Sequence, residues 1–284
     1  MDPALTEHLE WLRLRRLAPA TISRRRRVLG WVGKRLGRPL LQASAADLES
    51  WRAALRVAPE AAKIYISDVR QFYRWAHARG LLPLDPAALI PSPRCGRRLP
   101  RPIGEASLMA AVTSAPPRIR PWLVLAGWAG LRACEIAWLR REHVLDTARH
   151  PVIVIAADAT KGLYEHVIPM CTFVRAELGP LLPRRGWVFT RADGVPGPNS
   201  PNRVSRLANT YLHDLGIGET LHQLRHRFGT ETYRVSRDLR RVQELMGHRT
   251  PIATAGYAAV AAVDAVATVE ALAIPGLAPC RQAS

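Results

Sequence analysis

Residues 151–170 read PVIVIAADATKGLYEHVIPM and contain the clearest strand signal in the chain. Two short runs that favour strands, PVIVIAAD and LYEHVIPM, flank ATKG, and this arrangement is typical of a β-hairpin. A further short strand and turn is expected at WVFTRADG, residues 187–194. Apolar residues recur at helical spacing through most of the remaining sequence. The sequence therefore predicts a mainly α fold with a small β-sheet.

Helices are predicted on both sides of this hairpin. A Gly-Leu turn at residues 130–131 leads into a short helix that opens at Arg132 and continues through Leu139. Gly247 is expected to stop a later helix, because glycine commonly follows a helix end. The other helices are expected near 104–114, 118–129, 199–214, 222–235 and 238–246, with a small apolar helix at 260–272.

The first 80 residues predict helices throughout, in a four-helix segment. Ser44 is expected to cap the third helix, with Asp47 at the capping-box position. The fourth helix carries an apolar stripe made of Ile64, Val69, Phe72, Tyr73 and Ala76. These patterns give a helical domain at 1–82.

A stretch of different composition follows this helical domain. Residues 82–102 read LPLDPAALIPSPRCGRRLPRP and hold six prolines with several arginines. Proline stiffens a segment and blocks helix continuation, which is typical of a linker between domains. The predicted organisation is therefore a helical domain at 1–82, a basic linker at 83–102 and a second domain at 103–284.

The chain is strongly basic. Its 284 residues include 41 Lys and Arg against 23 Asp and Glu, a formal net charge of +18. A polyanion is the expected partner, with nucleic acid before a membrane surface, although coding bias can also enrich arginine. Lysine occurs only at Lys34, Lys63 and Lys161. Since guanidinium is a very poor proton donor, a lysine in this background is a candidate for proton transfer.

The sequence also indicates a compartment. The four cysteines are scattered without CxxC or zinc spacing, the N-terminus has no secretory signal, and no run approaches eighteen apolar residues. A cytoplasmic protein is expected, associated with the nucleoid, or in the host cytoplasm if a phage encodes it.

Residues 221–230, LHQLRHRFGT, gather two histidines and two arginines. His222 and Arg225 share a helix face, and like charges held close favour an anion between them. The spacing of His222 and His226 would also suit zinc. However, Gln223 replaces the glutamate of HExxH and Arg225 would repel a cation, so no metal is expected.

This stretch is part of a larger set of residues that resembles the tyrosine recombinase (phage integrase) family. The other members are Arg132, Lys161, the GH pair ending at His248, and Tyr257. The resemblance extends from about residue 104 to 272. It implies an α+β catalytic domain behind a helical, SAM-like core-binding domain. It also implies a site-specific recombinase that cleaves and rejoins DNA through a 3′-phosphotyrosine, without cofactor or metal.

The resemblance assigns a role to each site residue, and the roles agree with what phosphodiester cleavage needs. Arg132 and Arg225 would hold the non-bridging oxygens, and Glu135 would orient Arg132. His222 and His248 would add hydrogen bonds, with His222 a plausible general base. Lys161 would protonate the departing 5′ oxygen, and Tyr257 would attack phosphorus.

Simpler interpretations stay open for several residues. His226 is either a packing residue or a participant in catalysis. Lys161 is otherwise an ordinary hairpin tip, and Tyr257 a half-buried aromatic. Six arginines are candidate phosphate contacts, although a run of charges is often only a solvated helix face. These are Arg24, Arg25, Arg27, Arg97, Arg98 and Arg101.

The resemblance further implies double-stranded DNA with a specific core site as partner. It implies a dimer on one site and a tetramer in synapsis, with an accessory bending or directionality factor possible. The helix at 260–272 would dock within its own subunit or on a neighbour. The two domains are expected to grip the duplex from opposite sides.

The biological role has four candidates. The chain begins directly with the core-binding-like segment, which favours a simple phage or mobile-element integrase without an arm-binding domain. The alternatives are an Xer-type chromosome-dimer resolvase, a type IB topoisomerase and a non-catalytic DNA-binding regulator. Intact candidates at every catalytic position argue against the regulator.

Overall fold

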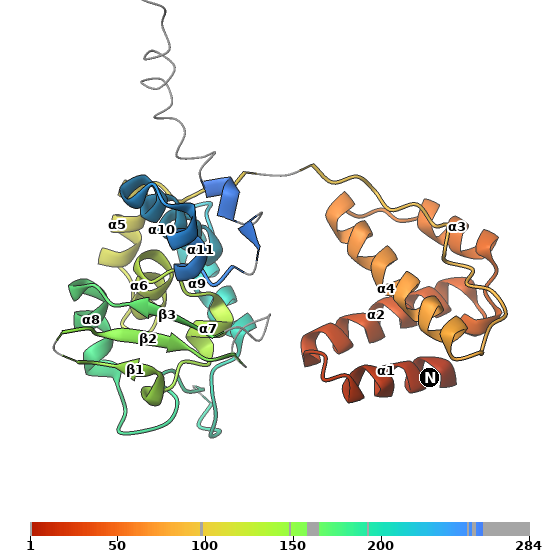
Figure 1. Ribbon diagram of the computed structural model, residues 1–284, viewed down its shortest axis with the longest axis horizontal. Helices are drawn as coiled ribbons and strands as arrows, with labels where there is room; N and C mark the ends of the chain where they lie inside the picture. The colour runs from red at the N-terminus through yellow and green to blue at the C-terminus, as the bar shows by residue number, and fades with distance from the viewer. Residues whose placement is uncertain are drawn as a thin grey trace, which may run out of the picture. The chain divides into compact units, whose positions relative to one another are not determined.

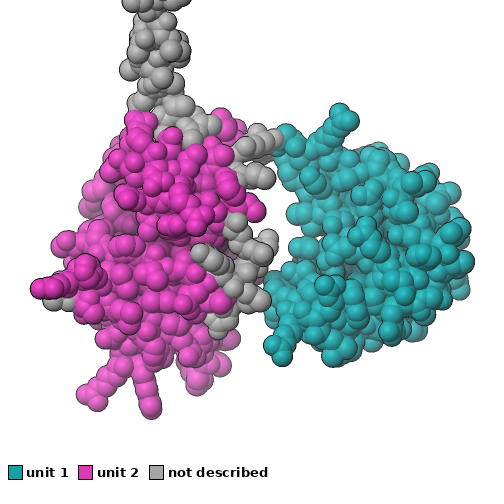
Figure 2. All heavy atoms as spheres, in the orientation of Figure 1, with its two compact units in different colours: residues 1–97 teal, residues 98–284 magenta. Residues whose placement is uncertain are grey.

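The computed structural model describes residues 2–96, 99–147, 149–157, 165–191, 193–248, 250–251 and 254–257. The chain divides into two compact units, Met1–Arg97 and Arg98–Ser284 (Figure 2). The division falls inside the range predicted to be a linker, and the extent of each domain stays a prediction. Within the described ranges, every helix is too short or too polar to cross a membrane.

The first unit is helical. Its elements are α1 (Pro3–Leu14), α2 (Pro19–Leu36), the 3-10 turn η1 (Leu40–Gln42), α3 (Ala45–Ala53) and α4 (Pro59–Ala78) (Figure 1). Proline occupies the first position of α1, α2 and α4, where its missing N–H costs no hydrogen bond. Ser44 and Asp47 form the predicted capping box at the start of α3.

The buried face of α4 differs from the predicted stripe at one position. Val69, Phe72, Tyr73 and Ala76 are buried as expected, but Ile64 is 44% exposed. Ile66 is buried in its place, because i, i+3 and i+7 spacing from residue 66 leads to residues 69 and 73. Ile64 lies on another face of the helix.

The second unit packs helices against a small sheet whose strands bury alternate residues (Figure 1). Strands β1 (Val144–Leu145), β2 (Val152–Ile155) and β3 (His166–Pro169) pair antiparallel in the order β1-β2-β3. The register runs from Val152 opposite Pro169 to Ile155 opposite His166, so the two predicted hairpin strands are confirmed. The ATKG tip lies outside the described residues.

The helices of this unit agree with the sequence patterns to within a few residues, except the helix at Thr172–Leu178, which was not predicted. They are α5 (Glu105–Thr113), α6 (Arg120–Trp128), α7 (Ala133–Ala137), α8 (Thr172–Leu178), α9 (Pro201–Asp214), α10 (Leu221–Ser236) and α11 (Leu239–Leu245), with 3-10 turns η2 (Arg141–His143) and η4 (Gly179–Leu181). The predicted apolar helix at 260–272 lies outside the described residues. The mainly α fold with a small antiparallel sheet is as predicted.

The prediction of a strand at 187–194 is wrong. These residues form only isolated bridges, Arg140 with Trp187 and Thr190 with Pro198. The N–H of Val188 donates to Leu139, whereas the Phe189 carbonyl accepts from Asn199. Because successive backbone groups bond to different segments, no continuous ladder forms.

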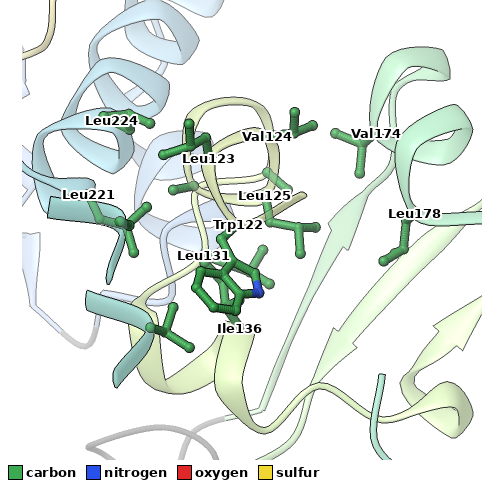
Figure 3. Close-up of a cluster of buried hydrophobic side chains, with 14 of the residues drawn as sticks. Trp122, Leu123, Val124, Leu125, Leu131, Ile136, Val174, Leu178, Leu221 and Leu224 are labelled. Atoms are coloured by element: carbon green, nitrogen blue, oxygen red, sulfur yellow. The ribbon is translucent and has the colours of Figure 1, made fainter. Parts of the chain in front are cut away.

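Helix α6 is the centre of the core. Trp122, Leu123, Val124 and Leu125 are all buried. Figure 3 shows these side chains between Leu221 and Leu224 of α10 on one side and Val174 and Leu178 of α8 on the other. The packing fixes α10 against α6, and this contact positions the arginine-bearing face of α10 beside the end of α6.

Candidate active site

A tight turn after α6 brings Arg132 to the site. The Leu131 N–H donates to the Leu125 carbonyl, and Gly130 adopts φ 66°. A side chain at Gly130 would also place its Cβ 2.3 Å from the Phe228 ring of α10. Glycine is therefore required for both the backbone conformation and the close approach. Arg132 follows as the N-cap of α7.

Glu135 holds Arg132 at two points. One carboxylate oxygen accepts from the Arg132 backbone N–H at 2.7 Å, and the other accepts from its Nη1 at 2.6 Å. The Glu135 side chain is fully buried, whereas the Arg132 side chain is 27% exposed. The carboxylate thus fixes the orientation of Arg132 and leaves part of its guanidinium accessible.

Arg225 reaches the same carboxylate from α10. Its side chain is 2% exposed, and Nη1 lies 3.4 Å from Glu135 Oε2. Nη1 also donates to the Gly130 carbonyl and Nη2 to the Met246 carbonyl. Arg132 Nη2 reaches that same Met246 carbonyl at 3.4 Å. Residues 132 and 225, far apart in sequence, thus converge on one carboxylate and one carbonyl.

The cluster retains one uncompensated positive charge, because two guanidiniums share a single buried carboxylate. Burial lowers the pKa of Arg225 to about 10, and Glu135 opposes that shift. Arg225 therefore stays protonated at neutral pH. Such an arrangement suits an anion, since an added negative charge would neutralise the excess.

Three histidines lie around this cluster, and each has a lowered pKa. They are His222, His226 and His248. Desolvation is the main cause for all three, and Arg225 adds to it. The pKa falls to about 4 for His226 and to about 3 for His248. His248 Nδ1 lies 3.0 Å from Thr254 Oγ1, which fixes its ring. All three rings are neutral at pH 7, so each has one nitrogen that donates and one that accepts.

Tyr257 completes the cluster. Residues 254–257 are helical, and the Tyr257 side chain is 2% exposed. Its ring stacks on His248, with centroids 6.0 Å apart and planes 8° apart, and its hydroxyl lies 3.0 Å from His226 Nδ1. Burial raises the pKa of the Tyr257 phenol, and Arg225 and Arg132 oppose the rise. The phenol is therefore protonated at neutral pH.

The structure brings most of the predicted site residues together. These are Arg132, Glu135, His222, Arg225, His248 and Tyr257. Lys161 lies outside the described residues. Sequence reasoning missed the contact between His226 and Tyr257, which are 31 positions apart, and the shared carbonyl of Met246. Through the described ranges, no group of three or more His, Cys, Asp or Glu side chains is arranged to hold a metal ion.

The arginines predicted to contact phosphates differ in their surroundings. Arg25 is buried and donates to Asp68 at 3.2 Å and to Gln71, so its guanidinium ties α2 to α4 and has no surface for a phosphate. Arg24 forms a two-bond pair with the same Asp68, at 2.8 Å for each bond. Arg27 and Arg101 are exposed. Arg97 and Arg98 lie outside the described residues.

A second basic feature was not anticipated from the sequence. An open cleft of about 650 Å³ lies at the start of α9, and Arg191, Arg203 and Arg206 line it. The N-cap Ser200 makes no capping hydrogen bond through its side chain. Arg191 pairs with Asp193, which also lines the cleft. Arg203, Arg206 and the start of the helix are therefore what favour an anion there. The sequence signal was weak, because the three arginines are spread over sixteen positions.

Gly229 lies so close to the Tyr257 ring that a side chain at this position is expected to collide with it. A Cβ at residue 229 would lie 2.8 Å from Tyr257 Cζ, so Gly229→Ala must displace the ring. We expect this overpacking to lower the free energy of unfolding by about 1–3 kcal/mol. Gly30→Ala in α2 is the matched control, because a Cβ there would meet nothing within 4 Å, and its stability should be nearly unchanged. Equal losses of stability in both variants, measured by chemical unfolding, would contradict the expectation.

Known proteins similar to this chain agree with the geometry. The model described as "Phage integrase family" matches residues 105–263. Tyrosine recombinase XerC of Yersinia pestis is 30% identical over 279 residues, covering 90% of each chain. Tyrosine recombinase XerD of Caulobacter vibrioides is 30% identical over 251 residues, covering 80% of each chain.

The solved structures support the fold. A lambda integrase (75–356) dimer bound to a COC′ core site has a TM-score of 0.72 at 17% identity, covering 90% of this chain and 94% of that one. The post-cleavage complex of XerH with a palindromic difH substrate has a TM-score of 0.63 at 15% identity, covering 82% and 73%. The family match spans more than half of the sequence. The chain therefore belongs to the phage integrase family and is a tyrosine recombinase, an enzyme that cleaves and rejoins DNA strands.

Proposed function

We propose that Tyr257 is the nucleophile and that Arg132 and Arg225 stabilise the phosphodiester it attacks. The observation that carries this proposal is the convergence of both guanidiniums on Glu135 next to the buried phenol. The phosphate of the cleaved strand would supply the negative charge that the cluster lacks. Arg132 is the more accessible of the two cations, and Arg225 would be reached as the phosphate settles.

The reaction balances with these groups. The Tyr257 oxygen bonds to phosphorus and gives its proton to a neutral histidine of the cluster, while the bond from phosphorus to the 5′ oxygen breaks. His222 and His248 donate hydrogen bonds to the non-bridging oxygens, and we assign protonation of the 5′ oxygen to Lys161. The product is a 3′-phosphotyrosine with a free 5′ hydroxyl. Because the ester retains the energy of the broken bond, a different 5′ hydroxyl can attack it without ATP.

A nicked suicide substrate tests this proposal. Cleavage close to the nick releases a short oligonucleotide, so religation fails and the covalent complex accumulates. We expect a denaturation-resistant protein–DNA adduct, with the nucleotide attached to the peptide that contains Tyr257. Attachment to another residue, or the absence of any adduct on a substrate that the protein binds specifically, would overturn the proposal.

We further propose that the partner is double-stranded DNA with a defined core site, bound by two copies of the chain. The related lambda integrase structure is a dimer on a core site. The exposed Arg27 and Arg101 and the arginine-lined cleft of α9 are the candidate phosphate contacts. Assembly into a tetramer and the use of an accessory factor belong to the same proposal.

DNA affinity should depend steeply on salt, because each phosphate contact releases condensed counterions. With roughly six to ten contacts, binding should weaken about 10³-fold or more between about 50 and 200 mM salt. Fluorescence anisotropy with a duplex that carries the core site measures this directly. Arg206→Gln should lower the slope of the log–log plot by about one. An affinity that hardly changes with salt would contradict phosphate contacts as the main source of binding.

We propose two alternative biological roles. The first is integration or excision of a phage or mobile element. The second is Xer-type resolution, and the XerC and XerD names of the relatives favour it. Sequencing the DNA protected by purified protein separates them. Integration joins two different sites, whereas resolution acts between two copies of one site.

A further inference from the structure

His226 is the side chain hydrogen-bonded to the nucleophile. Its Nδ1 lies 3.0 Å from the Tyr257 hydroxyl, and the two ring centroids are 5.8 Å apart. The His226 backbone carbonyl accepts from Thr230 Oγ1, which lies one turn further along α10. The contact with the hydroxyl directs Nδ1 of the imidazole at the phenol oxygen.

His222 is less well placed for the same task. Its ring meets the ring of His226 edge to face, with centroids 4.6 Å apart. The residue as a whole is exposed, although the part of the ring that faces the cluster is desolvated enough to lower its pKa. The imidazole in contact with the phenol oxygen is that of His226. His222 therefore remains available to donate a hydrogen bond to a phosphate oxygen.

We propose that His226 is a catalytic residue that accepts the proton of Tyr257 during attack on phosphorus. This inference rests on the proposed role of Tyr257 as nucleophile. Before attack, the phenol O–H donates to Nδ1 and the imidazole carries its proton on Nε2. As the oxygen bonds to phosphorus, the proton moves to Nδ1 and the ring becomes an imidazolium. Religation returns the proton to the phenol, so the cycle balances without another reactant.

The charges around His226 couple this transfer to DNA binding. The groups near it are His222 and Arg225 on its own helix, and His248 and Tyr257 of the C-terminal segment. Arg132 acts on His248 and Tyr257. Desolvation, His222 and Arg225 lower the pKa of His226, while burial raises the pKa of the phenol. The proton therefore stays on Tyr257 in the free enzyme. A bound phosphodiester opposes the field of the arginines and makes the imidazolium more stable.

The decisive variant is His226→Asn. Its Oδ1 occupies roughly the position of Nδ1 and still accepts a hydrogen bond, but it cannot take up a proton. Positioning of the phenol is thus kept and base catalysis is lost. We expect the trapping rate on the nicked substrate to fall at least about a hundredfold, with DNA affinity unchanged. His222→Asn, which makes the same exchange one turn earlier, is the comparison and should slow trapping less.

A second substrate identifies the proton that is affected. In a substrate with sulfur in place of the bridging 5′ oxygen, the leaving group needs no proton, but the phenol must still lose its own. The defect of His226→Asn should persist on this substrate. Trapping within about threefold of the wild-type rate on the ordinary substrate overturns the inference, as does rescue by the sulfur substrate, which would assign His226 to the leaving group.

Two controls keep the outcomes distinct. Thermal unfolding and DNA binding show whether His226→Asn is folded, and His226→Ala, which also removes the base, replaces it under the same thresholds if it is not. An adduct formed by Tyr257→Phe would overturn the proposed nucleophile itself. Loss of the adduct in Tyr257→Phe with normal trapping by His226→Asn would overturn only the role of His226.

Discussion

Tyr257→Phe is expected to abolish the covalent adduct while leaving DNA binding intact. The substitution removes the oxygen that would bond to phosphorus and leaves the ring stacked on His248. Because the arginine cluster is untouched, the phosphate would still be held. Among the described residues the hydroxyl bonds only to His226, and losing that bond should cost only about 1 kcal/mol of stability. Gel analysis of trapped complexes over several hours measures the loss.

Tyr233→Phe is the matched control for this experiment. Tyr233 packs against the same small cluster of Val242, Met246 and Tyr257, and the substitution removes the same phenolic oxygen. We expect this variant to trap DNA at nearly the wild-type rate. Trapping by Tyr257→Phe, or its loss in Tyr233→Phe alone, would assign the nucleophile elsewhere.

Arg225→Lys is expected to cause the second largest loss, although the charge is preserved. The guanidinium donates in separate directions to the carbonyls of Gly130 and Met246 and also lies beside Glu135. An ammonium group on a flexible stem cannot reproduce this planar arrangement. The trapping rate should fall about 10²- to 10³-fold, as when a preorganised donor is removed from a site of developing charge. Buried carbonyls left unpaired should also cost about 1–3 kcal/mol of unfolding free energy.

Arg227→Lys makes the same exchange two residues later on α10. Arg227 pairs with Glu105 at 2.6 Å and packs over Trp128, so its guanidinium serves packing outside the cluster. This variant should trap DNA within a few-fold of the wild-type rate. Single-turnover trapping and chemical unfolding of both variants separate the catalytic loss from the structural one. Equal rates for the two variants would contradict the role given to Arg225.

Local patterns in the sequence predicted much of the fold. The two strand-favouring runs on either side of ATKG identified the hairpin, and the Ser44 capping box identified the start of α3. The strand at 187–194 could not be excluded in the same way, because its backbone partners lie in other segments. The exposed Ile64 shows the same limit, since two apolar residues close in sequence compete for one buried face.

The site was predictable in its members but not in its contacts. The order of Arg132, His222, Arg225, His248 and Tyr257 indicated a family and hence a reaction. It did not indicate which imidazole faces the phenol. Nor could the run of arginines in α2 reveal that Arg25 turns inward, because the acid that draws it there is Asp68, 43 positions away. Such choices depend on tertiary packing rather than on local spacing.

The carbonyl of Met246 limits which substitutions the enzyme can tolerate. It accepts from both Arg132 and Arg225, and it sits at the end of α11, directly before the segment that carries His248. A shift of that one helix end would disturb both cations and an imidazole together. Substitutions in α11 that move this helix end should therefore impair the site without touching any of its side chains, and second substitutions in the same helix end should restore it.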